Sequence, residues 1–117
     1  MAGTIQKIQN LVCEYYGVKT KELLSRRRPA RIAFPRMVGM YLSRETTSFS
    51  LEVIGEVFDR HHTAIIHGHA TVEDYMDIYP EIDMSVNYLR NCVPNVKPVP
   101  VVDYIPPAFL PYENCNN

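Results

Sequence analysis

Residues 50–75 constrain the fold of this chain most strongly, because they place two helical patterns on either side of a short polar break. The first pattern has one apolar face, formed at helical spacing by Leu51, Ile54, Val57 and Phe58. Ser50 precedes it, where a hydroxyl can cap the first free backbone N–H groups of a helix. The polar residues 59–61 then interrupt the pattern. An amphipathic helix is therefore predicted to end at this break.

A second amphipathic helix is predicted to follow. Its candidate core positions are Ile65, Ile66, Ala70, Val72 and Met76. His62, Thr63 and Ala64 would open it, at the end where a recognition helix presents side chains to base edges in the major groove. Thr63 suits two roles there, as a cap or as a contact to a base or phosphate. Gly55 would let the second helix pack closely, so the stretch predicts a helix–turn–helix.

The residues before this stretch predict further helices. An apolar stripe over residues 5–16 stops at Gly17, which suits a helix end. Thr20 is expected to cap a short helix that buries Leu23 and Leu24. The next helix is expected to begin at Pro35, because a missing N–H costs nothing at the first helical position.

A closing helix is predicted after residues 79–80, with an apolar stripe of Ile82, Val86, Leu89 and Val93. With 117 residues, the chain is expected to form one all-α domain of five or six helices over residues 1–93. Residues 94–117 hold six of the nine prolines, which predicts an extended tail. The aliphatic and aromatic residues of this tail leave three alternatives: it packs on the domain, docks on a partner, or joins a second copy.

Charge is distributed very unevenly along the chain. The total is −1, but residues 19–44 carry eight cations against one anion, and residues 45–117 carry three cations against eleven anions. Such a cationic patch can bind phosphate although the total is near zero. Its centre is a predicted basic loop over residues 25–35, with Arg26, Arg27, Arg28 and Arg31. An arginine that enters a narrow minor groove meets an enhanced negative potential, so this loop is a candidate groove probe.

Several other classes of protein are disfavoured. The apolar runs are far shorter than the ~20 residues that span a bilayer, and the amino terminus lacks the apolar core of a signal peptide. Three widely spaced cysteines without a CxxC pair favour a reduced, cytoplasmic protein. The four histidines are poorly spaced for zinc, so we expect no metal and no cofactor. Because the chain has no GxxxxGK[ST] loop or catalytic constellation, we expect no enzyme.

The segment IGEVFDRHHTAIIHGH resembles the signature of the DNA-binding domain of DnaA, the bacterial replication initiator. The matching positions are Ile54, Gly55, Phe58, Arg60, His62, Thr63, Ile65, Ile66 and His67. The resemblance extends over about residues 5–93, and it places the family's basic loop on residues 25–35 and its Pro-Arg pair on residues 35–36. The implied fold is the Trp-repressor-like helix–turn–helix domain of DnaA.

The resemblance also implies the contacts. Arg60, His61, His62, Thr63 and Ala64 would meet the major groove and its flanking phosphates. Arg28 would enter the minor groove, assisted by Arg26, Arg27 and Arg31, while Arg36 and Arg44 would hold phosphates. His67 is either a partly buried histidine or another phosphate contact. The expected partner is double-stranded DNA with a DnaA-box-like site, which in the family is short, asymmetric and AT-rich with a central cytosine pair.

Three positions depart from the family pattern: His61 replaces an aspartate, Ala64 a threonine and Met37 a glutamine. The family aspartate would accept a hydrogen bond from a cytosine amino group, so His61 is expected to alter the preferred site. Two biological roles remain open, a stand-alone regulator of replication or transcription and a fragment of a full initiator, and the tail favours the first. The alternative class is a protein-interaction adaptor that uses the basic loop and the proline-rich tail.

Overall fold

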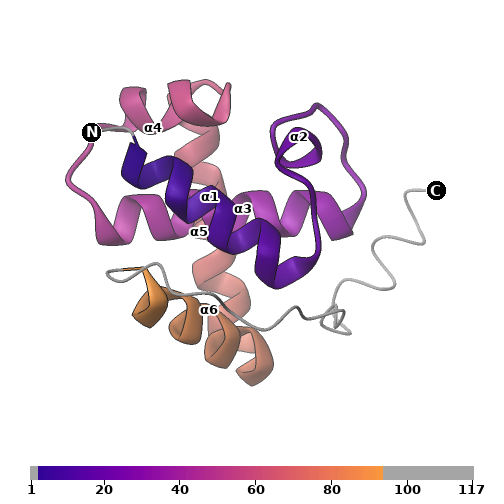
Figure 1. The fold of residues 1–117 in the computed structure, drawn as a ribbon. Coiled ribbons are helices and arrows are strands. Elements are labelled where there is room, and N and C mark those ends of the chain that lie inside the picture. Colours follow the sequence, from indigo (N-terminus) through magenta and orange to yellow (C-terminus); the bar gives the residue numbers. More distant parts are fainter. Residues whose placement is uncertain (1–2, 94–117) are drawn as a thin grey trace.

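Six helices, and no strand, make up residues 3–93, the part of the chain that this computed structural model describes (Figure 1). Their bounds are α1 Gly3–Tyr16, α2 Thr20–Leu23, α3 Ala30–Thr46, α4 Leu51–Phe58, α5 His62–Ile78 and α6 Pro80–Cys92. The predicted all-α class is confirmed. The predicted tail, residues 94–117, lies outside the described residues, so the predicted domain boundary after residue 93 stays a prediction.

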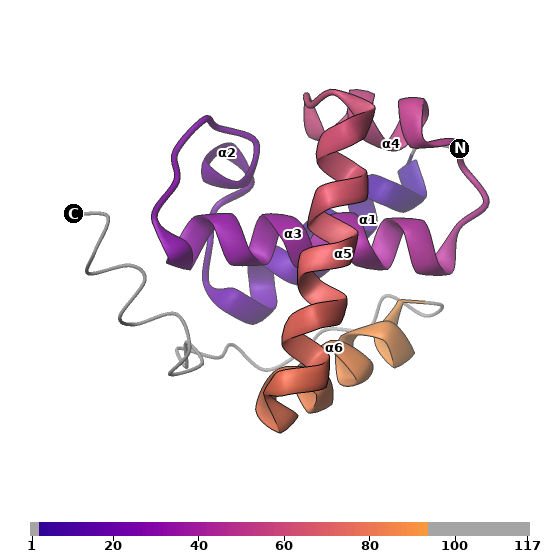
Figure 2. The same ribbon diagram turned by 180° about the vertical axis from the view of Figure 1, so that it is seen from behind.

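The helices are arranged around α3 and α5, which cross each other and form the most extensive helix–helix contact (Figure 2). Helices α2 and α4 and the amino end of α5 lie on one side of α3, whereas α6 lies on the other side (Figures 1 and 2). The fully buried side chains come from all six helices and include Ile5, Leu23, Leu42, Phe58, Ile65 and Leu89. No helix in the described part has the length and apolar character needed to cross a membrane.

The predicted end of α1 is confirmed, but the predicted start of α2 is correct only approximately. Gly17 ends α1 with a φ of +69°, a conformation that glycine adopts without strain. Helix α2 begins at Thr20, so Lys19 rather than Thr20 occupies the capping position, and the Lys19 backbone N–H donates to Glu22 Oε1 at 3.3 Å. Leu23 is fully buried, but Leu24 is only partly buried.

Helix α3 begins at Ala30, five residues before the predicted start at Pro35. Pro35 lies inside the helix, where it removes one backbone N–H. The burial of Ala30, Ile32 and Phe34, each at most 1% exposed, offsets that loss because it holds the first turns of α3 against the core. The loop between α2 and α3 therefore covers only residues 24–29, called the basic loop below.

The predicted helix–turn–helix is formed by α4, residues 59–61 and α5. The Val53 backbone N–H donates to Ser50 Oγ at 3.2 Å, which confirms the predicted cap of α4. Asp59 has a left-handed φ of 56° and begins the turn. A Cβ atom on Gly55 would lie 2.6 Å from the carbonyl oxygen of Arg60. Gly55 is therefore required by the close approach of the turn itself, more than by the packing of the second helix.

The buried face of α5 differs in part from the predicted one. Ile65 and Val72 are fully buried as predicted, but Ile66 is 40% exposed and Ala70 is also exposed. Gly68 and His69 are buried in their place, because they share the helix face of Ile65 and Val72. A Cβ atom on Gly68 would lie 2.9 Å from Met40 Sδ, so glycine brings α5 close to α3.

Candidate nucleic-acid interface

The amino end of α5 is open to solvent. His61 precedes the helix as its cap, since the Thr63 backbone N–H donates to His61 Nδ1 at 3.3 Å. His61 rather than Thr63 therefore supplies the capping group. His61 and Thr63 are exposed, and His62 and Ala64 are half-buried. Four of the five side chains that the sequence assigned to the major groove and its flanking phosphates thus lie around one helix end, and the fifth is Arg60.

The hydrogen bond to His61 fixes which ring nitrogen carries the proton. Nδ1 accepts from the Thr63 backbone and lies 3.0 Å from Thr63 Oγ1. In the neutral ring the other nitrogen, Nε2, then carries the hydrogen. His61 accordingly offers a hydrogen-bond donor to solvent, whereas a family aspartate at this position offers only acceptors.

The basic loop lies beside the turn of the helix–turn–helix. Arg26 donates from Nη1 to the carbonyl oxygen of Asp59 at 3.1 Å, and its Nη2 lies 3.5 Å from Asp59 Oδ2. A hollow of about 340 Å³ lies where loop and turn meet, lined by Arg26, Gly55, Glu56, Asp59, Arg60 and His61. The two segments predicted to contact different grooves of DNA are therefore joined in the folded chain.

The remaining arginines of this region differ in their pairing. Glu22 Oε2 lies 3.5 Å from Arg27 Nη1 and 3.3 Å from Arg31 Nη2. The Lys19 backbone N–H and these guanidinium groups lower the pKa of Glu22. Arg28 is exposed and has no hydrogen bond or ion pair within residues 3–93. Arg28 is thus the loop arginine whose guanidinium is free for a ligand.

Arg36 has a different role from the predicted phosphate contact. Its side chain is buried, with 7% of the residue exposed. It donates to the carbonyl oxygens of Leu23, Ser25 and Arg27 at 2.7, 2.9 and 3.0 Å, and to that of Glu22 at 3.4 Å. Burial, followed by the charge of Arg60, lowers the Arg36 pKa to about 10, so the group stays charged at neutral pH. Because the guanidinium is used inside the protein, the prediction of a phosphate contact is wrong.

Arg60 also contacts the protein backbone rather than extending from the amino end of α5. It donates from Nη1 to the carbonyl oxygens of Phe58 at 3.3 Å and Asp59 at 3.1 Å. Across the turn it reaches the carbonyl oxygens of Leu24, at 3.5 Å, and Ser25. Burial lowers the pKa of Arg60, and the nearby charge of Arg26 adds to this effect. Arg60 therefore joins the turn to the basic loop.

The rest of the predicted contacts lie farther along the helices. His67 is exposed one turn into α5, which contradicts the partly buried alternative for this histidine. Arg44 is exposed in the last turn of α3. Ile66 was assigned to the core by sequence, yet it is exposed next to His67 and three residues after Thr63. The helical spacing of residues 63, 66 and 67 was the signal that could have placed Ile66 on the outer face.

A comparison with known families identifies this arrangement. The family model for the bacterial DnaA protein helix-turn-helix matches residues 5–72, which is more than half of the chain. The chain belongs to this family. A DnaA helix–turn–helix is a DNA-binding domain, so DNA is the class of ligand to consider for the exposed histidines and arginines described above. The match ends inside α5, so α6 and the predicted resemblance of residues 73–93 lie outside it.

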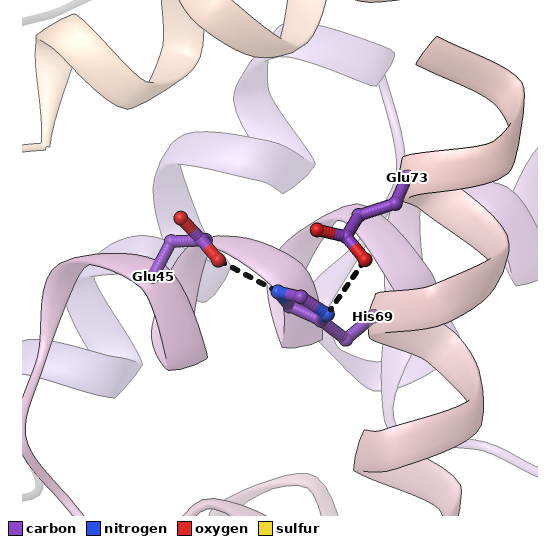
Figure 3. Close-up of side chains that lie close together, drawn as sticks. All are labelled: Glu45, His69 and Glu73. Carbon is purple, nitrogen blue, oxygen red and sulfur yellow. Dashed lines mark hydrogen bonds and ion pairs between the residues drawn. The ribbon is translucent and has the colours of Figure 1, made fainter. Parts of the chain in front are cut away.

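The far half of α5 in this DnaA-type domain carries a second polar cluster (Figure 3). His69 is buried, and its Nε2 donates to Glu45 Oε2 at 2.7 Å, while its Nδ1 lies 3.6 Å from Glu73 Oε1. Arg90 Nη2 of α6 lies 3.1 Å from Glu45 Oε1, and the His69 ring stacks on Tyr41. These contacts tie α3, α5 and α6 together.

The same cluster holds the residues that could bind a metal ion in the described part of the chain. One ligand atom each from Glu45, His69 and Glu73 lies within 4.8 Å of the others. Figure 3 shows the two carboxylates at opposite sides of the imidazole ring, each facing a different nitrogen. Since Arg90 forms an ion pair with Glu45, the contacts between helices are explained by this ion pair and by the hydrogen bond from His69 to Glu45.

Proposed function

We propose that this DnaA-type domain binds double-stranded DNA sequence-specifically, with α5 in the major groove and the basic loop in the adjacent minor groove. The observation that carries the proposal is the contact between Arg26 and Asp59, which brings the loop and the helix–turn–helix to one side of the molecule. A protein that contacts two neighbouring grooves needs both DNA-contacting segments on the same side of the molecule.

The exposed side chains support different contacts for the amino end of α5 and for the basic loop. His61, His62 and Thr63 at the amino end of α5 offer donors and acceptors to base edges, and Ala64 and Ile66 offer apolar surface for a thymine methyl group. Arg28 is the free guanidinium of the loop and suits the negative potential of a narrow minor groove. Arg26, Arg27, Arg31, Arg44 and His67 are exposed and suit phosphate contacts.

The biological role that we propose is the control of replication initiation or of transcription at DnaA-box-like sites in the cytoplasm of a bacterium. The domain would occupy such sites without any ATPase activity of its own. Binding by a single copy is sufficient, because an asymmetric box needs no two-fold symmetric protein.

The test is fluorescence anisotropy with two labelled duplexes, one carrying the DnaA box and one with the same bases scrambled, each at 50 and 200 mM salt. We expect tighter binding to the box, by about tenfold or more, and weaker binding to both duplexes at the higher salt. Arg28→Ala should lower affinity for the box by about ten- to a hundredfold. Arg90→Ala, on the far side of α3, is the control and should leave affinity unchanged.

Equal, salt-sensitive binding to the two duplexes would refute sequence-specific reading of this box but not DNA binding. Selection from a random duplex library would then reveal whether another sequence is preferred. Absence of binding to either duplex and to the library would refute the proposed function and leave the adaptor hypothesis.

A further inference from the structure

We propose that Arg36 and Arg60 are positioning residues that together fix the basic loop against the amino end of α5, and so set the distance between the minor-groove and major-groove contacts. This inference rests on the proposed function. The sequence assigned both arginines to DNA, but their guanidinium groups point to carbonyl oxygens of the protein. Below we call the two side chains the arginine clamp.

The first half of the clamp holds the loop from α3. Carbonyl groups at and beyond the end of a helix lack the N–H groups of a following turn. Arg36 supplies donors to three of them, in Leu23, Ser25 and Arg27, and it also reaches the Glu22 carbonyl oxygen, which already accepts from the Ser25 backbone N–H. These carbonyls span the end of α2 and the first half of the loop, so one buried side chain defines the path of the backbone up to Arg28.

The second half of the clamp holds the same loop from the turn of the helix–turn–helix. Arg60 reaches the carbonyl oxygens of Leu24 and Ser25, more than thirty residues earlier in the chain. Arg36 Nη2 also donates to Ser25, at 2.9 Å. The Ser25 carbonyl oxygen is therefore shared by two guanidinium groups, one from α3 and one from the turn.

Through this shared carbonyl, only a few atoms connect the basic loop to the amino end of α5. Arg28 follows Arg27, whose carbonyl is held by Arg36, and His61 follows Arg60, which holds Ser25. A displacement of either arginine would therefore change the position of Arg28 relative to the amino end of α5. Gly55 supports the same connection, since its missing Cβ allows the Arg60 backbone to approach α4.

Lysine cannot replace arginine in this role. A guanidinium is a planar group with five donors, whereas an ammonium is a single point charge on a flexible stem. The two guanidinium groups also repel each other, since the charge of Arg60 acts together with burial to lower the pKa of Arg36. The hydrogen bonds to carbonyl oxygens hold them together against this repulsion. Arg36→Lys and Arg60→Lys therefore keep the net charge of the interface but remove the planar set of donors that contacts several carbonyl oxygens.

The test compares these two variants and Arg90→Lys with the wild-type chain on chemically modified duplexes. Replacing adenine by 2-aminoadenine adds an amino group in the minor groove only, and replacing thymine by uracil removes a methyl group from the major groove only. For each protein, the ratio of affinities for the unmodified and modified duplex measures how strongly each groove is read.

We expect Arg36→Lys and Arg60→Lys to bring the minor-groove ratio close to one while at least half of the major-groove ratio is kept. Arg90→Lys makes the same substitution far from the loop and should change neither ratio. A uniform loss of affinity with both wild-type ratios retained would overturn the inference, because a simple phosphate contact would give that result.

A second readout needs no DNA and separates the clamp from the proposed function. Amide hydrogen exchange of residues 25–28 should become about tenfold faster or more in both clamp variants, with α1 and α3 unchanged. Unchanged exchange in the loop would overturn the clamp even if DNA binding is confirmed. The wild-type chain could bind the unmodified and the 2-aminoadenine duplex equally while the clamp variants still loosen the loop. In that case the clamp stands and the proposed minor-groove contact is refuted. If Arg36→Lys unfolds globally and exchanges quickly everywhere, Arg60→Lys alone decides, because Arg60 is only partly buried. Faster exchange confined to residues 25–28 would then support the clamp, and unchanged exchange there would overturn it.

Discussion

The two halves of α5 belong to one helix but use their polar residues in opposite ways. At the amino end, His62 and His67 have no hydrogen bond to a protein group within residues 3–93. Two turns after His62, His69 is buried between Glu45 and Glu73. The same residue type is thus left open for a ligand at one end and fully used by the protein at the other.

The surroundings differ in charge as well. A hollow of about 330 Å³ beside the far half of α5 is lined by Glu73, Asp74, Asp77 and Asp83 together with Tyr41 and Met76. Burial raises the pKa of Tyr41, and the carboxylates of Glu45, Glu73 and Asp83 reinforce the effect. Phosphate is repelled from such a surface and attracted to the loop. Under the proposed function, the segregation of charge along the sequence would therefore orient the domain on DNA.

The largest expected effect comes from breaking the turn that supports the open end. Gly55→Ala places a Cβ atom 2.6 Å from the Arg60 carbonyl oxygen, a clash with backbone that no rotamer change relieves. We expect the free energy of unfolding to fall by about 2–3 kcal/mol, measured by urea denaturation. Gly3→Ala, where a Cβ atom meets nothing within 4 Å, is the matched control and should change stability little. Equal stability of the two variants would contradict the described turn.

The two histidines of α5 allow the comparison to be tested with one type of residue. His62→Ala should lower affinity for the DnaA box by about tenfold without changing stability, because a base or phosphate contact is lost. His69→Gln should lower the free energy of unfolding by about 1–2 kcal/mol, because the half-buried Glu45 carboxylate loses the hydrogen bond from the buried His69 ring. Its affinity per folded molecule should stay unchanged. Anisotropy and urea denaturation on both variants distinguish these outcomes, and a loss of affinity in both would contradict the division of α5.

The sequence predicted most of this architecture but not the uses of its arginines. Helical periodicity, Ser50 and Gly17 were sufficient to place α1, α4 and α5, because these elements depend on neighbouring residues. The start of α3 was wrong, since the local signal of Pro35 is weaker than the burial of Ile32 and Phe34 by distant helices. The assignment of Ile66 to the core was wrong for a similar reason, because the packing of α5 buries Gly68 and His69 instead.

Arg28 and Arg36 show the same limit at the candidate site. Both are arginines in the same basic segment, yet one is exposed and the other is buried among carbonyl oxygens. The difference depends on where α2 ends relative to α3, which no pattern along the chain reports. Charge patterning could therefore predict the cationic patch, but it could not distinguish side chains that bind a ligand from side chains that shape the site.

A smaller effect, on selectivity, is expected at His61. Because Nδ1 caps the helix, the neutral ring offers Nε2–H, which needs an acceptor such as guanine N7 or O6. His61→Asp replaces this donor by an acceptor and should shift preference toward cytosine at the contacted position, by about fivefold or more. Selection of both proteins from a random duplex library measures the shift. An identical pair of selected sequences would rule out base reading by His61.

The smallest expected effect is at Glu22, which pairs with Arg27 and Arg31. Glu22→Gln removes the anion that competes with phosphate for these arginines, so DNA affinity should rise by about twofold at low salt. The gain should shrink as salt rises. Glu81→Gln, on α6, removes the same charge from the far side and is the control for a general change in net charge.

The most direct test of the account is a titration of the ¹⁵N-labelled chain with the DnaA-box duplex, followed by amide chemical shifts. The account predicts the largest shifts in residues 25–28 of the basic loop and residues 61–67 of α5. The amides of residues 73–78 and of α6 should move little, because the acidic half of α5 faces away from DNA. Large shifts at residues 73–78 with none in the loop would contradict the division of α5 into a DNA-binding end and a structural end.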